Sequence, residues 1–169
     1  MLAPRPLNGT LEVQEEMQVD LKAALPHLLP KAISWAEAAA TRGAGAGREL
    51  TERERDFARK VGVTHPERIR VIIVDALPMP TDPPLRAAAE QTGFLDPRMV
   101  GLTLGHSVFI CRDRETARLL SHEFRHVYQY EQAGSIADFL PGYLVQIVER
   151  GYADTTFETD ARAHERTDL

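Results

Sequence analysis

Apolar positions along the chain follow two periods, one typical of strands and one typical of helices. A β-branched run over 68–77 and a second run over 100–111 predict two strands, and Gly105 is expected to mark a bulge or a close backbone approach. Helical spacing predicts helices over 17–29, 31–42, 50–60, 84–94, 112–134, 135–150 and from about Thr155 onward. A few strands among many helices predict an α+β fold.

Helix breakers divide this pattern. Pro26 is expected to interrupt the first helix, and Pro141-Gly142 to kink or split the helix over 135–150. The GAGAG run (43–47) indicates a flexible connector rather than a phosphate-binding loop, because no strand precedes it and no Gly-Lys-Ser/Thr follows it. We therefore expect a loose start over 1–16 within an N-terminal helical segment, 1–62, followed by a core over 63–169.

Three helix ends carry recognisable signals. Thr51 is expected to cap the helix over 50–60, and Asp113 the helix over 112–134. Gly93 is expected to close the helix over 84–94.

Composition narrows the class of protein. At 169 residues the chain fits one domain, and its formal net charge of −5, with both signs intermixed, offers no basic patch for nucleic acid or anionic lipid. A single cysteine excludes an intrachain disulfide framework. No signal peptide and no membrane-spanning run is apparent, so we expect a soluble, cytoplasmic protein.

The helix over 112–134 contains the motif that carries chemistry. His122-Glu123-Phe124-Arg125-His126 is H-E-x-x-H, and the two histidines lie one turn apart on one face, where both imidazoles can reach one metal ion. Glu123 lies beside them without needing to bind the metal, so it can take a proton from a zinc-activated water and pass it to a leaving amine. The alternative, without a metal site, is a helix whose two histidines face solvent.

A catalytic zinc site needs a third protein ligand. The metzincin continuation fails, because Val-Tyr-Gln-Tyr-Glu follows His126. The segment FETDARAHE (157–165) offers Glu158 first, with Asp160 and His164 as alternatives, and only one of them can face the metal. Glu158 has a competing interpretation, since Thr155-x-x-Glu158 is also a capping box.

These residues resemble the gluzincin metallopeptidases, in which HExxH is followed downstream by a glutamate ligand. The stretch from GLTLG through HEFRHVYQY to FETDA is similar to small bacterial domains of the DUF4157 type, over about residues 68–165. The resemblance implies a minimal zincin-like domain, in which a small β-sheet packs on the active-site helix beside further C-terminal helices. It also implies a zinc-dependent peptidase whose substrate lies as an added strand beside residues 102–110.

The chain departs from this pattern at several positions. Gluzincins carry an acidic residue four positions after the glutamate ligand to orient a histidine; here Arg162 stands there, so Asp160, Glu165 or a carbonyl must supply that bond. No oxyanion donor is unambiguous: the candidates are Tyr143, Tyr152 and His106, and a packing or surface role is favoured for each of them over that of a donor. Cys111 is interpreted as a buried apolar residue rather than a ligand.

The sequence thus predicts a zinc peptidase acting on a protein or peptide, with His122, His126 and Glu158 as ligands and Glu123 as base. A catalytically silent zinc-binding accessory domain is the alternative. The acidic balance disfavours a third class, the DNA-associated SprT-like metalloproteases, so neither nucleic acid nor membrane is an expected partner. Substrate identity and oligomeric state do not follow from the sequence.

Overall fold

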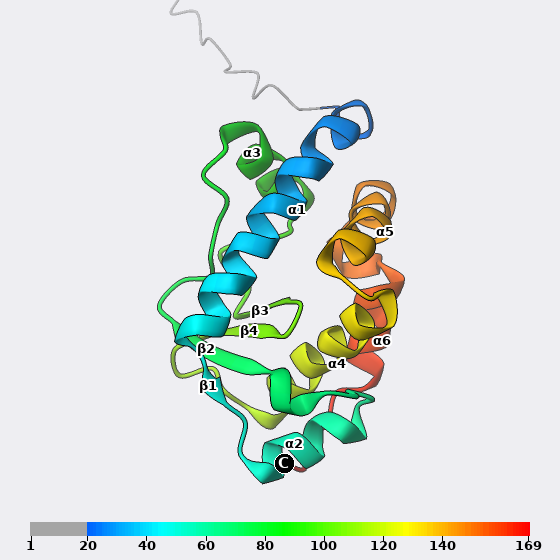
Figure 1. Ribbon diagram of the computed structural model, residues 1–169. Coiled ribbons are helices and arrows are strands. Elements are labelled where there is room, and N and C mark those ends of the chain that lie inside the picture. Colours follow the sequence, from blue (N-terminus) through cyan, green and yellow to red (C-terminus); the bar gives the residue numbers. More distant parts are fainter. Residues whose placement is uncertain (1–19) are drawn as a thin grey trace, which may run out of the picture.

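A four-stranded mixed sheet with strand order β1-β2-β4-β3 forms the centre of the computed structural model, which describes residues 20–169 (Figure 1). The strands are β1 (Arg48–Glu49), β2 (Arg70–Val74), β3 (Gly101–Leu104) and β4 (Ser107–Cys111). Strands β2 and β4 are parallel, whereas β1 and β3 run antiparallel to their neighbours, so β3 is an edge strand.

Six α-helices surround the sheet within these residues, which confirms the α+β class. They are α1 (Leu21–Ala46), α2 (Glu52–Lys60), α3 (Pro83–Thr92), α4 (Ala117–Ala133), α5 (Ile136–Arg150) and α6 (Thr156–Ala163), with single 3₁₀ turns at Pro66–Arg68 and Tyr152–Asp154. Over residues 20–169, no helix has both the length and the apolar character needed to cross a membrane. The loose start expected over 1–16 lies outside the described residues.

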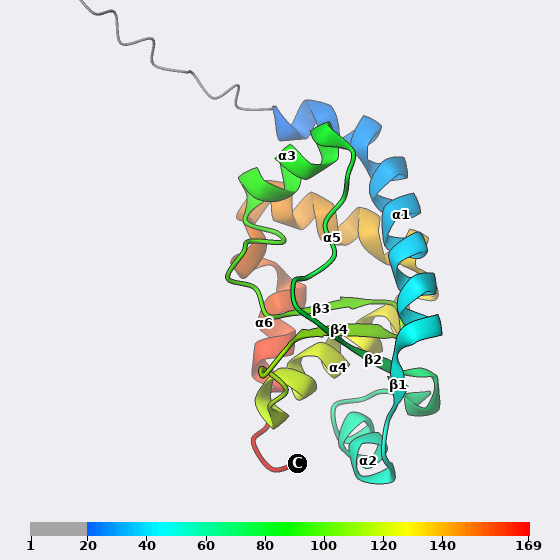
Figure 2. The ribbon, with the colours of Figure 1, turned by 90° about the vertical axis from the view of Figure 1, so that its left-hand side faces the viewer.

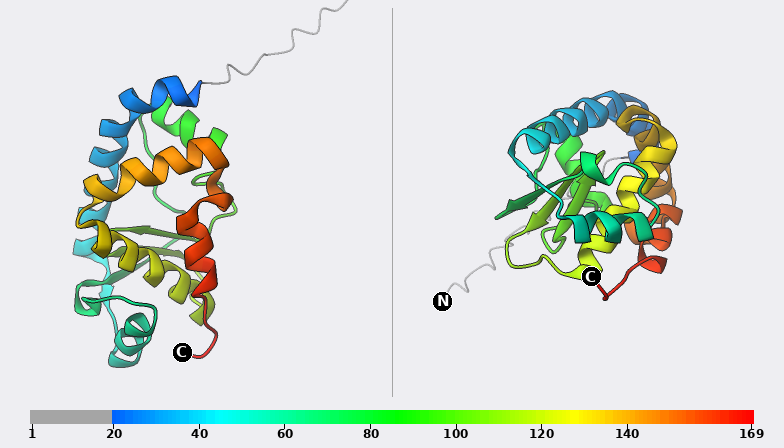
Figure 3. Two further views of the ribbon diagram at one scale, coloured as in Figure 1. Left: turned by 90° about the vertical axis from the view of Figure 1, so that its right-hand side faces the viewer. Right: turned by 60° about the horizontal axis from the view of Figure 1, so that its bottom comes forward.

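Different helices pack on the two faces of the sheet. Val108 and Ile110 pack on one face with Phe57 of α2 and Phe124 of α4. The alternating residues Leu102, Leu104 and Phe109 pack on the other face against α1 and α5. Figure 2 shows the sheet between α5 on one side and α4 on the other, and Figure 3 shows α6 running beside α4.

Helix α1 differs from the prediction, because it runs through Pro26, Pro30 and most of the GAGAG segment without a break. Both prolines are exposed, so the carbonyl groups that they leave unbonded face solvent while the opposite side of the helix is buried. Gly43 explains the glycine run: a Cβ there would lie 2.8 Å from Cζ of Phe109, so the helix can approach the sheet only with glycine. The predicted connector is therefore a packed helix end.

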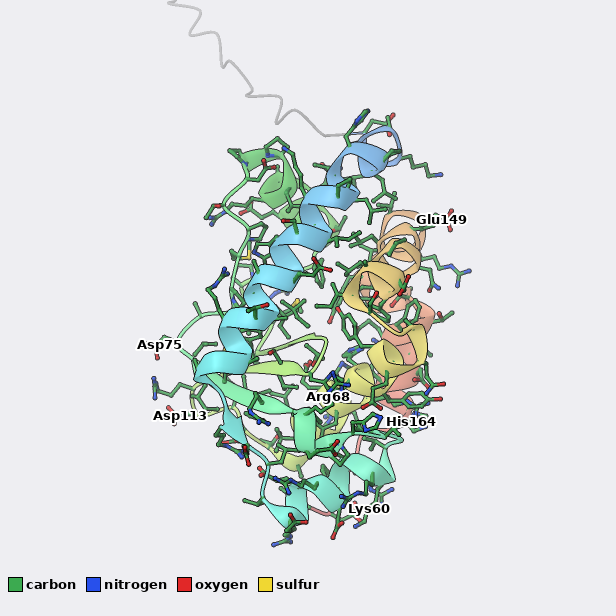
Figure 4. All side chains as sticks on the ribbon, in the orientation of Figure 1. Lys60, Arg68, Asp75, Asp113, Glu149 and His164 are labelled. Atoms are coloured by element: carbon green, nitrogen blue, oxygen red, sulfur yellow. The ribbon has the colours of Figure 1, made fainter. Side chains whose placement is uncertain are left out.

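Three further expectations were wrong in detail. The strand predicted over 100–111 is a hairpin, because Gly105, with φ 63°, turns the chain between β3 and β4. Asp113 does not cap α4; it lies in the preceding turn with φ 63° (labelled in Figure 4), and Thr116 accepts the capping bond from Leu119 N. Helix α5 is not split at Pro141, because it continues through that residue as one element; the kink expected as the other outcome stays a prediction.

Other local predictions are confirmed. Thr51 caps α2 in a reciprocal capping box with Glu54, and Gly93 closes α3 in the left-handed conformation. Thr155 caps α6 by accepting a bond from Glu158 N.

Candidate metal centre

Helix α4 has an apolar side and a polar side, as its sequence pattern predicts. Phe124 and Val127 are fully buried against the sheet. His122 and His126 project from the other side toward α6, which brings Glu158 against them although it lies 32 residues beyond His126 in the chain. The contact between α4 and α6, visible in Figure 3, therefore assembles the three residues.

Three metal-ligating side chains converge at this contact. Nε2 of His122 lies 3.2 Å from Nε2 of His126, and the Glu158 carboxylate lies 3.3 Å from the first and 3.2 Å from the second. Donor atoms held tetrahedrally at about 2.0–2.1 Å from zinc are about 3.3–3.4 Å apart. Among the described residues, these three form the group of histidine, cysteine and carboxylate side chains able to hold a metal ion.

The hydrogen bonds at the far nitrogens fix both rings. Nδ1 of His122 donates to Oε1 of Glu165 at 3.1 Å. Nδ1 of His126 donates to Oε1 of Gln129 at 2.8 Å, since the amide nitrogen of Gln129 is used on Phe157 O and Asp160 Oδ2. Each neutral ring therefore presents an unprotonated Nε2, which is the tautomer that binds metal.

The two facing Nε2 atoms are stable only with a proton or a metal ion between them. Two Nε2 lone pairs that face each other at 3.2 Å repel unless a proton or a metal ion lies between them. The soft-to-intermediate imidazole nitrogens and one carboxylate are a donor set that zinc accepts in catalytic sites. The residues therefore fit a zinc ion.

The pKa shifts of His122 and Glu158 without a metal ion also indicate a site for positive charge. Burial disfavours the charged form of His122, but the bond with Glu158 and the charge of Glu123 outweigh it and raise the pKa to about 9. Burial would raise the pKa of Glu158, yet the bonds from His122 and His126 hold it well below its ordinary value. The site thus strongly favours a positive charge beside a carboxylate.

Glu123 is held next to this group by the edge strand. The Thr103 hydroxyl of β3 donates to Oε2 of Glu123 at 2.7 Å, and burial raises the pKa of the carboxyl. Gly101 provides the space for it, because a Cβ at that position would lie 2.3 Å from Oε1 of Glu123. Neither contact was predicted: GLTLG (101–105) belongs to the stretch that carries the resemblance, but the contacts of Gly101 and Thr103 with Glu123 depend on how β3 lies on α4.

The alternative ligands lie elsewhere. The Asp160 carboxylate binds Arg125, at 2.7 and 3.1 Å, and Nδ1 of His164 (labelled in Figure 4) donates to the Asp160 carbonyl at 2.8 Å. The Glu158 backbone N–H donates the cap bond to the Thr155 hydroxyl, but the Glu158 side chain turns to the histidines, so the capping box is not reciprocal. The bond that Arg162 cannot make to a histidine comes from Glu165 and Gln129.

The candidate oxyanion donors separate into two groups. Tyr143 donates to Oε1 of Glu158 at 2.9 Å, and Tyr152 lines the same small cavity as Glu123, His126 and Glu158. Burial, together with the nearby charge of Glu158, raises the pKa of both phenols, which therefore remain donors. His106 lies at a different place, on Glu131. Cys111 is partly buried at the end of β4, with Sγ toward Met99 O.

Access to the cavity is narrow. All four residues of β3 are buried, and Phe139 and Tyr143 of α5 line the cavity beside them. Of the segment 102–110 that was expected to border the cleft, only Leu102 and Thr103 line the cavity, together with Gly101 just before it, because β4 lies in the interior of the sheet between β2 and β3. Because β3 is buried, a peptide could pair with its edge only after the residues that cover it move.

Searches against protein-family models, curated proteins and solved structures found no match to this chain. The zincin-like form of the fold therefore stays a hypothesis that is based on the motif and the site.

Proposed function

We propose that the chain is a zinc-dependent hydrolase of the gluzincin kind that cleaves peptide bonds, with His122, His126 and Glu158 as the zinc ligands. The observation that carries the proposal is the convergence of their three donor atoms beside a buried carboxylate, Glu123. A zinc ion bound there would polarise the scissile carbonyl and lower the pKa of a water to about 7.

Glu123 is the proposed general base. Thr103 occupies Oε2, which leaves Oε1 to accept a proton from the attacking water and then to deliver it to the leaving amine. The raised pKa that burial gives this carboxyl brings it closer to neutral pH, which favours both transfers.

The two tyrosines have different proposed roles. The Tyr143 hydroxyl donates a hydrogen bond to Glu158 and so orients that ligand. Tyr152 also reaches Glu158, but it is partly exposed and lines the same cavity, so it is the proposed donor to the oxygen that gains negative charge as the carbonyl is attacked.

Glu123→Gln tests the proposal. The variant should bind one zinc per chain, as the natural chain does, but lose about 10²–10⁴-fold in turnover, because the amide cannot accept the proton. Zinc content is measured by mass spectrometry and turnover on a mixture of peptides. The matched control is Glu149→Gln, an exposed glutamate of α5 (labelled in Figure 4), which should change neither quantity.

A catalytically silent zinc-binding accessory domain is the second candidate. The burial of β3 favours it, since this edge is closed to an added peptide strand. If the zinc-loaded natural chain and Glu123→Gln are equally inactive on all peptides while both bind zinc, this second function replaces the first.

A further inference from the structure

An apolar cavity next to the metal centre is lined by residues of α1, α3 and α5. Figures 1 and 2 show that these three helices lie near one another at the same end of the molecule. The walls of the cavity include Leu28 of α1, Leu85 and Ala88 of α3, and Leu144 of α5. It has room for about four to six water-sized groups at roughly 10–15 Å³ each, which is about the size of one leucine, methionine or phenylalanine side chain.

The lining is almost entirely apolar. Its polar side-chain groups are the Trp35 indole N–H and the Thr92 hydroxyl, and the Thr92 hydroxyl is already used on the carbonyls of Ala88 and Ala89, at 2.9 and 3.0 Å. A charged group, or one with several hydrogen bonds to water, would lose most of them here, so the cavity favours an apolar group.

The apolar cavity adjoins the metal-centre cavity at one aromatic residue. Phe94 lines both, and its ring lies 5.9 Å from the ring of Tyr143 and 5.9 Å from that of Tyr152. Along β3, Leu102 lines the metal-centre cavity and Leu104 lines the apolar one. Residues two apart on a strand are about 6.4–6.8 Å apart, which is the spacing of alternate side chains in an extended peptide.

We propose that this apolar cavity is the subsite that receives one large apolar side chain of the peptide cleaved at the metal centre, with Phe94 as the wall between them. The proposal rests on the proposed function and names its substrate class: peptides with leucine, methionine or phenylalanine at one fixed position.

Ala88→Phe tests the subsite because it fills the cavity from α3, away from the metal ligands. The natural chain should cleave peptides with leucine at the selected position at least about tenfold faster, in kcat/KM, than peptides with alanine there. In Ala88→Phe this preference should fall to about twofold or less, with zinc content unchanged. Ala87→Phe, on the exposed side of the same helix, should keep the natural preference. If Ala88→Phe does not fold, judged by circular dichroism, Ala88→Leu takes its place.

A folded, zinc-loaded Ala88→Phe that keeps the natural preference overturns the subsite. A binding experiment separates this failure from that of the proposed function, because it needs no turnover. Zinc-loaded Glu123→Gln is titrated with N-acetyl-leucinamide and N-acetyl-alaninamide while leucine methyl signals are followed by NMR. Shifts at Leu85 and Leu144 with the leucine probe alone, lost on adding Ala88→Phe, support the subsite even if no peptide is cleaved. Equal responses to both probes overturn it.

Discussion

Helix α4 contributes to two histidine–glutamate clusters, one near its middle and one near its C-terminal end. In the first, Glu158 meets His122 and His126, and the pKa of both histidines is raised. In the second, Glu131 meets His106 at 3.0 Å, but burial outweighs that bond and lowers the pKa of His106.

The two clusters differ in the partners of their carboxylates. Glu131 already accepts bonds from the backbone N–H groups of Thr64 and His65, at 2.6 and 2.9 Å, so it anchors a loop. Glu158 accepts a side-chain bond from Tyr143, and both of its oxygens face imidazoles whose other nitrogens are held by Glu165 and Gln129. A metal centre therefore requires several donor atoms that converge on one point, rather than a single contact between histidine and glutamate.

The largest expected effect comes from removing the converging carboxylate. Glu158→Ala should weaken zinc binding more than about 100-fold, beyond the 10–100-fold typical of a residue that only orients a ligand. Zinc affinity is measured by competition with a chelator, beside Asp160→Ala, His164→Ala and Glu131→Ala. If Asp160→Ala alone empties the site, the ligand assignment is wrong.

The next largest effect is expected from filling the space that Gly101 of β3 leaves for the Glu123 carboxylate. Gly101→Ala should push the Glu123 carboxylate from its place and reduce turnover about 100-fold, with zinc content retained, because the new Cβ overlaps Oε1. Gly142→Ala, where a Cβ has open space, is the matched control. Unchanged kcat in a folded Gly101→Ala would contradict the assigned position of the base.

The residues behind the histidines sharpen the comparison further. Gln129→Leu and Glu165→Ala should each weaken zinc binding about 10–100-fold, since each histidine loses the acceptor that fixes its ring. Arg118→Ala removes an exposed partner of Glu165 and should change zinc affinity less than about twofold. Equal losses in all three variants would indicate general damage to the fold.

The smallest expected effect is at the second cluster. Glu131→Gln should leave zinc binding unchanged and lower the free energy of unfolding by about 1–2 kcal/mol near neutral pH. Bonds from Thr64 and His106 outweigh burial and lower the Glu131 pKa, so its contribution is present above the ordinary value of 4.5 and is lost as pH falls through the folded value. The difference between variant and natural chain, measured by urea unfolding, should therefore shrink at acid pH.

Local signals in the sequence predicted much of the fold. The α+β class, the caps at Thr51 and Thr155, and the stop at Gly93 follow from side-chain chemistry within one turn of helix. Helix α1 shows the limit of such signals. Two prolines and a glycine run predict breaks, but the burial of its small-residue face against the sheet and α5 outweighs their local cost.

The candidate site divides in the same way. His122, Glu123 and His126 follow from the sequence alone, because five residues of one helix fix their relative positions. The contact between Gln129 and His126 also lies within one turn of α4. The choice of Glu158 over Asp160 and His164, the bond from Glu165, and the fit of Gly101 and Thr103 around the base depend instead on how β3 and the chain over 156–165 pack on α4. Helical periodicity acts over a few residues, whereas these contacts join positions 20 to 43 residues apart, so only the tertiary structure could decide them.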